Sequence, residues 1–278
     1  MRAIILAAFL SLSIASSAQY YYKDIVGTKE SSELVHSYLQ NKISKVVINS
    51  FDAAGERDEN FFVEQQFSPL KRSLTTITRA SAANPTYLIS WFDTDGRIIK
   101  TIDSSEVIVT QTSYEYNPAG QLIKVVSSSS DSANKASMKE EHIWNWNGNI
   151  PVKMLRIKNN IDTVYLDFKM DENGNVIEEQ ETHRKVKSFP VFYYYNSKNQ
   201  LTDIAQYNAR VAKVLPNYMF EYSDKGQVIQ KITVPSNKSD YLIWRFQYND
   251  NGLRTKEAIY DKQKKLTGRI EYQYSTGS

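Results

Sequence analysis

Three histidines are the side chains in this sequence best suited to acid–base or metal chemistry near neutral pH. They stand at His36, His142 and His183, and no two have the spacing of a metal-ligand pair. His36 lies in a stretch with helical spacing, and His183 stands beside Arg184 and Lys185. His142 occupies a strand position where equivalent strands carry Tyr or Phe. We therefore expect structural roles for all three.

Other catalytic and cation-binding patterns are missing or incomplete. The chain has no cysteine, which excludes thiol catalysis, and no Gly-x-Ser-x-Gly elbow. The run Asp171-x-Asn173-Gly174 is similar to a calcium loop, but the glutamate needed at the twelfth place is absent. Nothing marks a glycosidase pair among the acidic doublets, which are Asp58–Glu59, Glu140–Glu141 and Glu178–Glu179. We predict no catalytic residue, no metal site, no cofactor and no enzyme activity.

Aromatic side chains are the remaining candidates for ligand contact. The chain has 19 Tyr, 11 Phe and 4 Trp, and most of those beside turns fit core and cross-strand packing. A minority break the inward-facing pattern or sit at turns, where exposed rings suit a sugar or a peptide. The predicted ligand-contact residues are Trp91, Trp146, Tyr194 and Trp244.

The glycines reveal a repeat. Eight polar windows of four residues end in Gly or Asn, and from Gly96 onward their spacings are 24, 28, 26, 25, 27 and 26 residues. The period is therefore about 26 residues. The windows are Asp52–Gly55, Asp93–Gly96, Asn117–Gly120, Asn145–Gly148, Asp171–Gly174, Asn196–Asn199, Ser223–Gly226 and Asn249–Gly252.

The residue types in these windows predict β-hairpins. Asp, Asn or Ser in first place can accept bonds from its own turn, and Gly or Asn in fourth place tolerates the left-handed conformation. Together they predict a type I turn closed by a G1 bulge. In that register Tyr116 faces Leu122 and Tyr222 faces Val228 across each strand pair.

Segments outside the regular windows give four further expectations. Residues 31–39 have a capping serine and helical spacing, which predicts one short helix that caps the sheet or lies against it. Residues 61–67 and 74–78 predict an extra strand pair. Residues 127–136 are polar and predict a long exposed loop, and residues 260–266 predict a degenerate last turn.

The N-terminus indicates export. Met1-Arg2, the apolar run 3–14 and Ser16-Ser17-Ala18 have the form of a signal peptide cleaved after Ala18. No other run is long enough to span a bilayer as a helix, and a net charge of +3 argues against a nucleic-acid partner. The expected organisation is a signal peptide (1–18), an N-terminal segment with a short helix (19–48) and a repeat domain (49–278), in the periplasm or at the cell surface.

The repeat resembles a known family. Tyr114-Glu115-Tyr116-Asn117-Pro118-Ala119-Gly120-Gln121-Leu122 is similar to the YD, or RHS, repeat, as is the segment 220–228. Similar copies extend over about residues 86–275. The resemblance implies long, curling antiparallel sheets, which in large bacterial toxin-delivery proteins form a shell around a cargo. This chain has too few repeats to close such a shell. Choline-binding repeats are a second, more distant resemblance.

The predicted fold is all-β: consecutive antiparallel β-hairpin repeats in one curled sheet, with one short N-terminal helix. A four-bladed propeller is the alternative. For function we expect an exported, non-catalytic scaffold or interaction protein whose partner is an unknown envelope protein. The alternative is a carbohydrate-binding envelope module, with a glycan as the ligand of its exposed aromatics.

Overall fold

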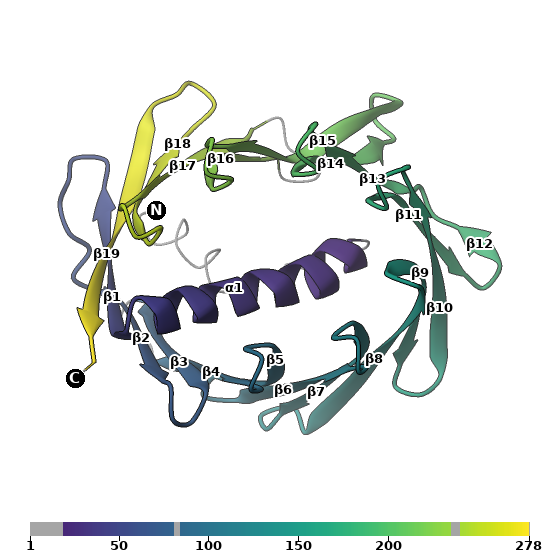
Figure 1. Cartoon of the computed structure of the whole chain (residues 1–278), viewed down its shortest axis with the longest axis horizontal. Helices are drawn as coiled ribbons and strands as arrows, with labels where there is room; N and C mark the ends of the chain where they lie inside the picture. The colour runs from purple at the N-terminus through teal and green to yellow at the C-terminus, as the bar shows by residue number, and fades with distance from the viewer. Residues whose placement is uncertain (1–18, 81–83, 235–239, 278) are drawn as a thin grey trace.

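The computed structural model describes residues 19–80, 84–234 and 240–277, which form a ring of strands crossed by a helix (Figure 1). The helical part comprises a π-helical segment, η1 (Tyr21–Val26), and α1 (Gly27–Gln40). The strands are β1 (Ile43–Asp52), β2 (Phe61–Ser68), β3 (Ser73–Ala80), β4 (Thr86–Phe92), β5 (Ile98–Ser104), β6 (Ile108–Tyr116), β7 (Leu122–Asp131), β8 (Ala136–Asn147), β9 (Ile150–Lys158), β10 (Asp162–Met170), β11 (Val176–His183), β12 (Val186–Lys187), β13 (Val191–Tyr195), β14 (Leu201–Asn208), β15 (Lys213–Tyr222), β16 (Val228–Thr233), β17 (Leu242–Tyr248), β18 (Arg254–Tyr260) and β19 (Leu266–Thr276).

The sheet is closed, so the prediction of one open, curled sheet is wrong, as is the propeller alternative. With the two-residue β12 set aside, each strand pairs antiparallel with its neighbour along the chain, and β1 pairs with both β2 and β19. β11 pairs with β13 as well as with the two-residue β12, so 18 of the 19 strands make up the barrel. Closure removes both free edges and lets the apolar face of a single-layer sheet face inward.

The predicted turn chemistry is confirmed in most windows. At Asp93–Gly96 the Gly96 N–H bonds the Asp93 carbonyl, the Asp93 carboxylate accepts two backbone N–H groups, and the ladder shifts at Phe92. Tyr116 pairs with Leu122 and Tyr222 with Val228, as expected. The same turn closes the degenerate segment near the C-terminus, where Lys264 takes the left-handed position with φ 61°.

Two expectations about the connections need correction. Gly148 does not close a four-residue window, because Asn147 pairs with Ile150 and leaves a two-residue turn of Gly148 and Asn149. The Ser-rich segment is not a long loop, because β7 continues to Asp131, β8 starts at Ala136, and serine hydroxyls bond threonines on β6.

The connections alternate between two rims. The turns ending at Gly96, Gly120, Gly174, Asn199, Gly226 and Gly252 all lie on one rim, named here the glycine rim, together with the β8–β9 turn. The turns ending at Gly55 and Lys264 share the chemistry but lie on the opposite rim. The predicted strand pair at residues 61–78 is confirmed as β2 and β3.

The helix is longer than predicted, and of the two predicted positions it takes the second. It covers residues 27–40 rather than 31–39, continues η1, and lies inside the ring against the inner face of the sheet instead of capping one end (Figure 1). The first strand starts at Ile43, immediately after it. Closure and the helix together cover the inward face, because the two core clusters combine wall residues with Tyr20 at one end of the helical segment and with Val35 and Tyr38 at the other.

A hydrogen bond links most hairpins to the one before. The ring near the turn donates its O–H or N–H to a backbone carbonyl two residues past the preceding turn, at 2.7–2.9 Å. This bond explains why the position favours Tyr over Phe. The pairs are Tyr116 to Ile98, Trp146 to Leu122, Tyr195 to Val176, Tyr222 to Leu201, Tyr248 to Val228 and Tyr274 to Arg254.

Loss of one such hydroxyl should have a measurable cost. We expect Tyr195→Phe to lower the free energy of unfolding by about 1 kcal/mol, since a part-buried carbonyl loses its partner. Tyr194→Phe is the matched control, because its half-exposed ring points outward from the same strand. Urea unfolding of both variants checks this, and equal stabilities would contradict it.

Candidate functional site

The N-terminal end of the helical segment is held by a buried carboxylate. Glu179 on β11 is 1% exposed and accepts the backbone N–H of Tyr20 at 3.0 Å and of Tyr21 at 3.1 Å. The Tyr193 hydroxyl donates to the same carboxylate at 2.7 Å. Burial raises the pKa of Glu179, while these three donors act in the opposite direction. A single wall side chain thus binds the start of the chain's helical segment.

One turn later, Asp24 forms the centre of a buried polar network. Its Oδ2 lies 2.6 Å from His142 Nδ1 and accepts the Trp144 indole N–H at 3.1 Å. The other ring nitrogen of His142, Nε2, lies 3.0 Å from Glu140 Oε1. Asp24 and His142 are both buried, so an aspartate of the helical segment and a histidine of β8 bind each other out of contact with solvent.

The two carboxylates keep His142 positively charged. Burial alone would lower its pKa, but Asp24 and Glu140 outweigh burial and raise it to about 9. In turn, the hydrogen bond from His142 lowers the pKa of Glu140. At neutral pH the network therefore contains an imidazolium between two carboxylates.

Aromatic packing surrounds this network. Tyr20 meets the His142 ring edge-on at 5.1 Å between centroids, and Arg156 contacts the Tyr20 hydroxyl and lies over its ring. Tyr21 packs on Tyr193, with ring centroids 5.4 Å apart. Tyr22 stacks on Tyr218 of β15. The consecutive tyrosines 20–22 thus reach strands on different parts of the wall.

The C-terminal half of α1 binds the wall in a second place. Tyr38 is 2% exposed, donates its hydroxyl to Gln65 Oε1 at 2.6 Å, and packs edge-on against Phe67 and Tyr274. The imidazole of His36 lies against the Gly96 turn, where a Cβ would approach it to 2.6 Å. The helix is therefore anchored at both ends and crosses the lumen between them.

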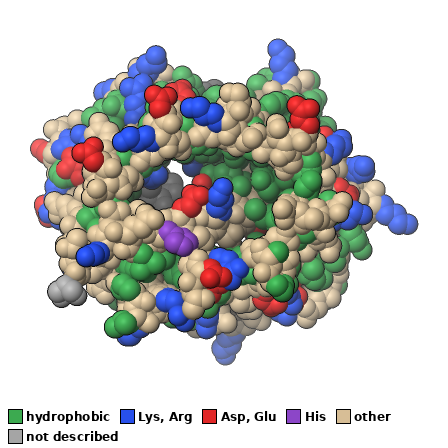
Figure 2. All heavy atoms as spheres, in the orientation of Figure 1, with side chains coloured by type: hydrophobic (Ala, Val, Ile, Leu, Met, Phe, Trp, Pro, Cys, Tyr) green, Lys and Arg blue, Asp and Glu red, His purple; other side chains and the backbone are tan. Residues whose placement is uncertain are grey.

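Between the anchors the lumen is charged and partly open. Arg254 bonds Glu257 at 2.8 Å, and the Tyr272 hydroxyl bonds the same carboxylate, which is fully buried. Lys231 and Glu30 of the helix interact electrostatically nearby. Figure 2 shows the helix across the opening of the ring, with hollows between it and the wall.

This arrangement holds the helical segment against the wall. A general base needs a ring nitrogen free to take a proton from substrate, and both nitrogens of His142 face carboxylates. Among the residues that the structure describes, no group of three or more His, Cys, Asp or Glu is placed to hold a metal ion. His183 bonds Asp162 at 2.6 Å on the rim opposite the glycine rim.

The four predicted ligand-contact aromatics are not brought together. They lie on β4, β8, β13 and β17, spread around the ring. Trp244 is 8% exposed, and Trp146 is part-buried with its indole N–H on the Leu122 carbonyl. Trp91 faces outward beneath Lys100, and Tyr194 is 49% exposed on the outer wall.

Sequence analysis gave His142 a structural role but missed its partners. Asp24 and the tyrosines 20–22 follow the predicted cleavage site after Ala18 and were given no role, and the partners of Asp24 lie more than a hundred residues away. The acidic doublets were a usable signal, because neighbours on a strand face opposite sides. Glu179 and Glu140 point inward to the helical segment, whereas Glu178 and Glu141 point outward to lysines.

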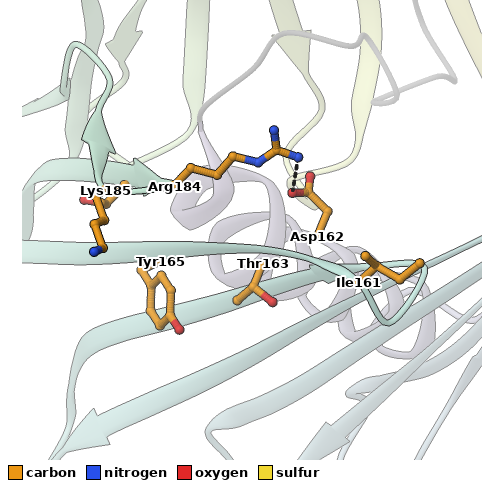
Figure 3. Close-up of a pocket in the computed structure, with 7 residues that line it drawn as sticks. Ile161, Asp162, Thr163, Tyr165, Arg184 and Lys185 are labelled. Atoms are coloured by element: carbon orange, nitrogen blue, oxygen red, sulfur yellow. Dashed lines mark ion pairs between the residues drawn. The ribbon is translucent and has the colours of Figure 1, made fainter.

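A shallow hollow lies outside the ring, near the β9–β10 and β11–β12 connections. It measures about 410 Å³ and is lined by Ile161, Asp162, Thr163, Tyr165, Thr182, Arg184 and Lys185 (Figure 3). Arg184 and Asp162 form an ion pair across it at 4.0 Å.

Comparison with known proteins gives structural likeness only. No protein-family model and no curated protein sequence matches the chain. It is similar to a porin-like protein from Bacteroides uniformis, with 11% identity over 84% of this chain and 96% of that chain and a TM-score of 0.42. It is similar to a porin-like protein from Bacteroides vulgatus, with 12% identity over 84% of this chain and 98% of that chain and a TM-score of 0.33. It is also similar to a chain of the Photorhabdus luminescens Tc holotoxin pore, with 12% identity over 78% of this chain and 12% of that chain and a TM-score of 0.34. These values show no family and carry no functional argument.

The buried imidazolium should make stability depend on pH. Because the pKa of His142 rises from 6.5 to about 9 on folding, its contribution is complete below pH 6.5 and is lost as pH rises through 9. The loss should be on the order of 3 kcal/mol. Urea unfolding from pH 6 to pH 9.5 should show this fall in the wild type and a flatter profile in His142→Gln.

The matched control is His183→Gln, which removes a half-exposed histidine from its single carboxylate partner. An exposed pair of this kind contributes little to stability, so its pH profile should follow the wild type. A His142→Gln profile as steep as the wild type would show that the network does not hold an imidazolium.

Proposed function

We propose that this chain is an exported, non-catalytic barrel protein that binds its partners on its outer wall and rims, with its N-terminal helix as a built-in plug. The observation that carries the proposal is the Asp24–His142–Glu140 network. It commits the most reactive side chains of the lumen to holding the helix. Because the helix crosses the lumen and leaves only hollows beside the wall, we place the binding surface on the outside of the ring.

The character of the outer wall supports a barrel that works in water. Ion pairs link neighbouring strands on the outward face, including Lys153 with Asp167 and Lys169 with Glu178. Lys124 and Lys139 both approach Glu141 there. Such pairs suit a hydrated surface, because charge facing lipid is costly.

The repeat itself supports a scaffold of the YD type. Its turns, bulges and ring-to-carbonyl bonds recur from hairpin to hairpin, so successive hairpins have the same backbone structure but different outward side chains. Such a wall suits surface recognition, because the outward residues can change without disturbing the inward bonds.

Thiol labelling of α1 tests whether the helix stays inside the lumen. The chain has no cysteine, so one can be placed at Val35 or at Leu39, two positions of α1 that are 2% and 45% exposed. We expect a thiol reagent to label Leu39→Cys at the rate of an open thiol. Val35→Cys should react at least about a hundredfold more slowly, because labelling requires local opening. Equal rates would mean that the helix leaves the lumen and that the lumen is the working site.

A second candidate, glycan binding, is favoured by the half-exposed Tyr194 on the outer wall. A thermal-shift panel of soluble glycans and cell-wall fragments tests it. A ligand at about 100 times its dissociation constant should add roughly 2.7 kcal/mol of stability. The shift should be lost in Tyr194→Ala and kept in Trp244→Phe, whose ring is buried. A panel with no shift would remove this candidate.

A further inference from the structure

Three neighbouring hairpin ends on the rim opposite the glycine turns expose apolar side chains to water. They are residues 158–162, 184–189 and 209–215, named here the three-hairpin patch. Ile161 is 87% exposed, Val186 70%, Phe189 62% and Val211 52%. Val214 and Leu215 add further exposed apolar surface. Apolar exposure on this scale, gathered in one place, marks an interaction site.

The same hairpin ends are strongly cationic. The three segments contain a single carboxylate, that of Asp162, and it is already bonded by His183. Among the described residues, Lys185 and Lys213 have no carboxylate within ion-pairing distance. The rest of the chain is nearly balanced, with a net charge of +3 overall, so this concentration is local. The cations are Lys158, Arg184, Lys185, Lys187, Arg210 and Lys213.

The three ends form one continuous surface. β11 pairs with both β10 and β13, so the hairpins follow one another around the rim. The rings of Phe189 and Tyr207 lie 4.2 Å apart and join the second hairpin to the third. The first two share the hollow of Figure 3, where Arg184 and Lys185 stand beside Tyr165. In Figure 1 the β11–β12 hairpin projects outward from the ring.

We propose that the three-hairpin patch attaches the barrel to an anionic lipid surface. Exposed apolar tips among lysines and arginines suit the boundary between acyl chains and anionic headgroups, where apolar groups insert and cations remain at phosphate level. The hollow is lined by two cations, Arg184 and Lys185, against one carboxylate, Asp162, and its volume of about 410 Å³ can admit a headgroup phosphate. A second copy of the chain does not fit, because two such patches would repel each other. This attachment goes beyond the plugged-barrel function and does not depend on the plug.

Vesicle co-sedimentation tests the proposal. The chain is used as residues 19–278, which hold every helix and strand that the structure describes, so that the apolar residues 3–14 do not bind lipid themselves. The vesicles are phosphatidylcholine alone or phosphatidylcholine with phosphatidylglycerol. We expect binding only to the second kind, weakening as salt rises because salt screens the attraction.

Two sets of substitutions separate charge from insertion. Arg184→Gln with Lys185→Gln and Lys213→Gln should weaken binding by roughly a hundredfold or more, since each cation near an anionic surface contributes independently. Val186→Ser with Phe189→Ser and Val211→Ser should also weaken it, and the loss should persist in high salt. All six side chains lie on exposed hairpin ends, and thermal melting confirms that the variants fold.

The β2–β3 turn provides the matched control. Leu70 is 98% exposed beside Lys71 on the glycine rim. Leu70→Ser with Lys71→Gln therefore removes one exposed apolar side chain and one cation from the rim opposite the three-hairpin patch. The control should bind vesicles as the wild type does. Absence of binding to anionic vesicles, or equal losses in the control and the patch variants, would overturn the proposal, and in the first case an acidic protein partner would replace the lipid. The thiol-labelling result at Val35 stands apart from either outcome.

Discussion

The fold depends on one constraint: a single-layer sheet has one apolar face and must cover it. Here the sheet does so by pairing its first strand with its last, Ile43 with Thr276 and onward along β1 and β19. That pairing turns the apolar face into a lumen and determines which residue of each strand points inward. The contact joins strands that lie far apart along the chain, and non-local pairings of this kind form slowly during folding.

The inward-facing side chains of the wall need packing partners, and the N-terminal helical segment supplies them. Its aromatic residues pack on the wall, and its Asp24 meets a wall histidine whose charge it stabilises. A buried charge is tolerable only with partners, and each charge here has them. His142 has two carboxylates, and Glu179 has two amides and a hydroxyl. These contacts link the start of the helical segment to β8 and β11, so the helix and the ring are one folding unit.

Local features of this molecule were readable from the sequence, whereas distant ones were not. The turn chemistry at Asp93–Gly96 and the pairing of Tyr116 with Leu122 follow from a few adjacent residues. The position of Gly148 failed because a two-residue turn and a four-residue window use the same residue types. Ring closure and the Asp24–His142 contact failed for a different reason. They join residues more than a hundred positions apart, and no local pattern marks the partner.

The ring-to-carbonyl bonds give the barrel a direction, since the ring of one hairpin donates to a carbonyl of the hairpin before it. A duplicated hairpin could therefore donate to the preceding hairpin and accept from the following one. It would add two strands without breaking the pattern. The circumference can change in such steps during evolution, but the span across it cannot. The 14 residues of α1 alone span about 21 Å at 1.5 Å per residue, and a wider ring would leave one end of the helical segment without a wall to bind. The length of the helix thus limits the number of repeats.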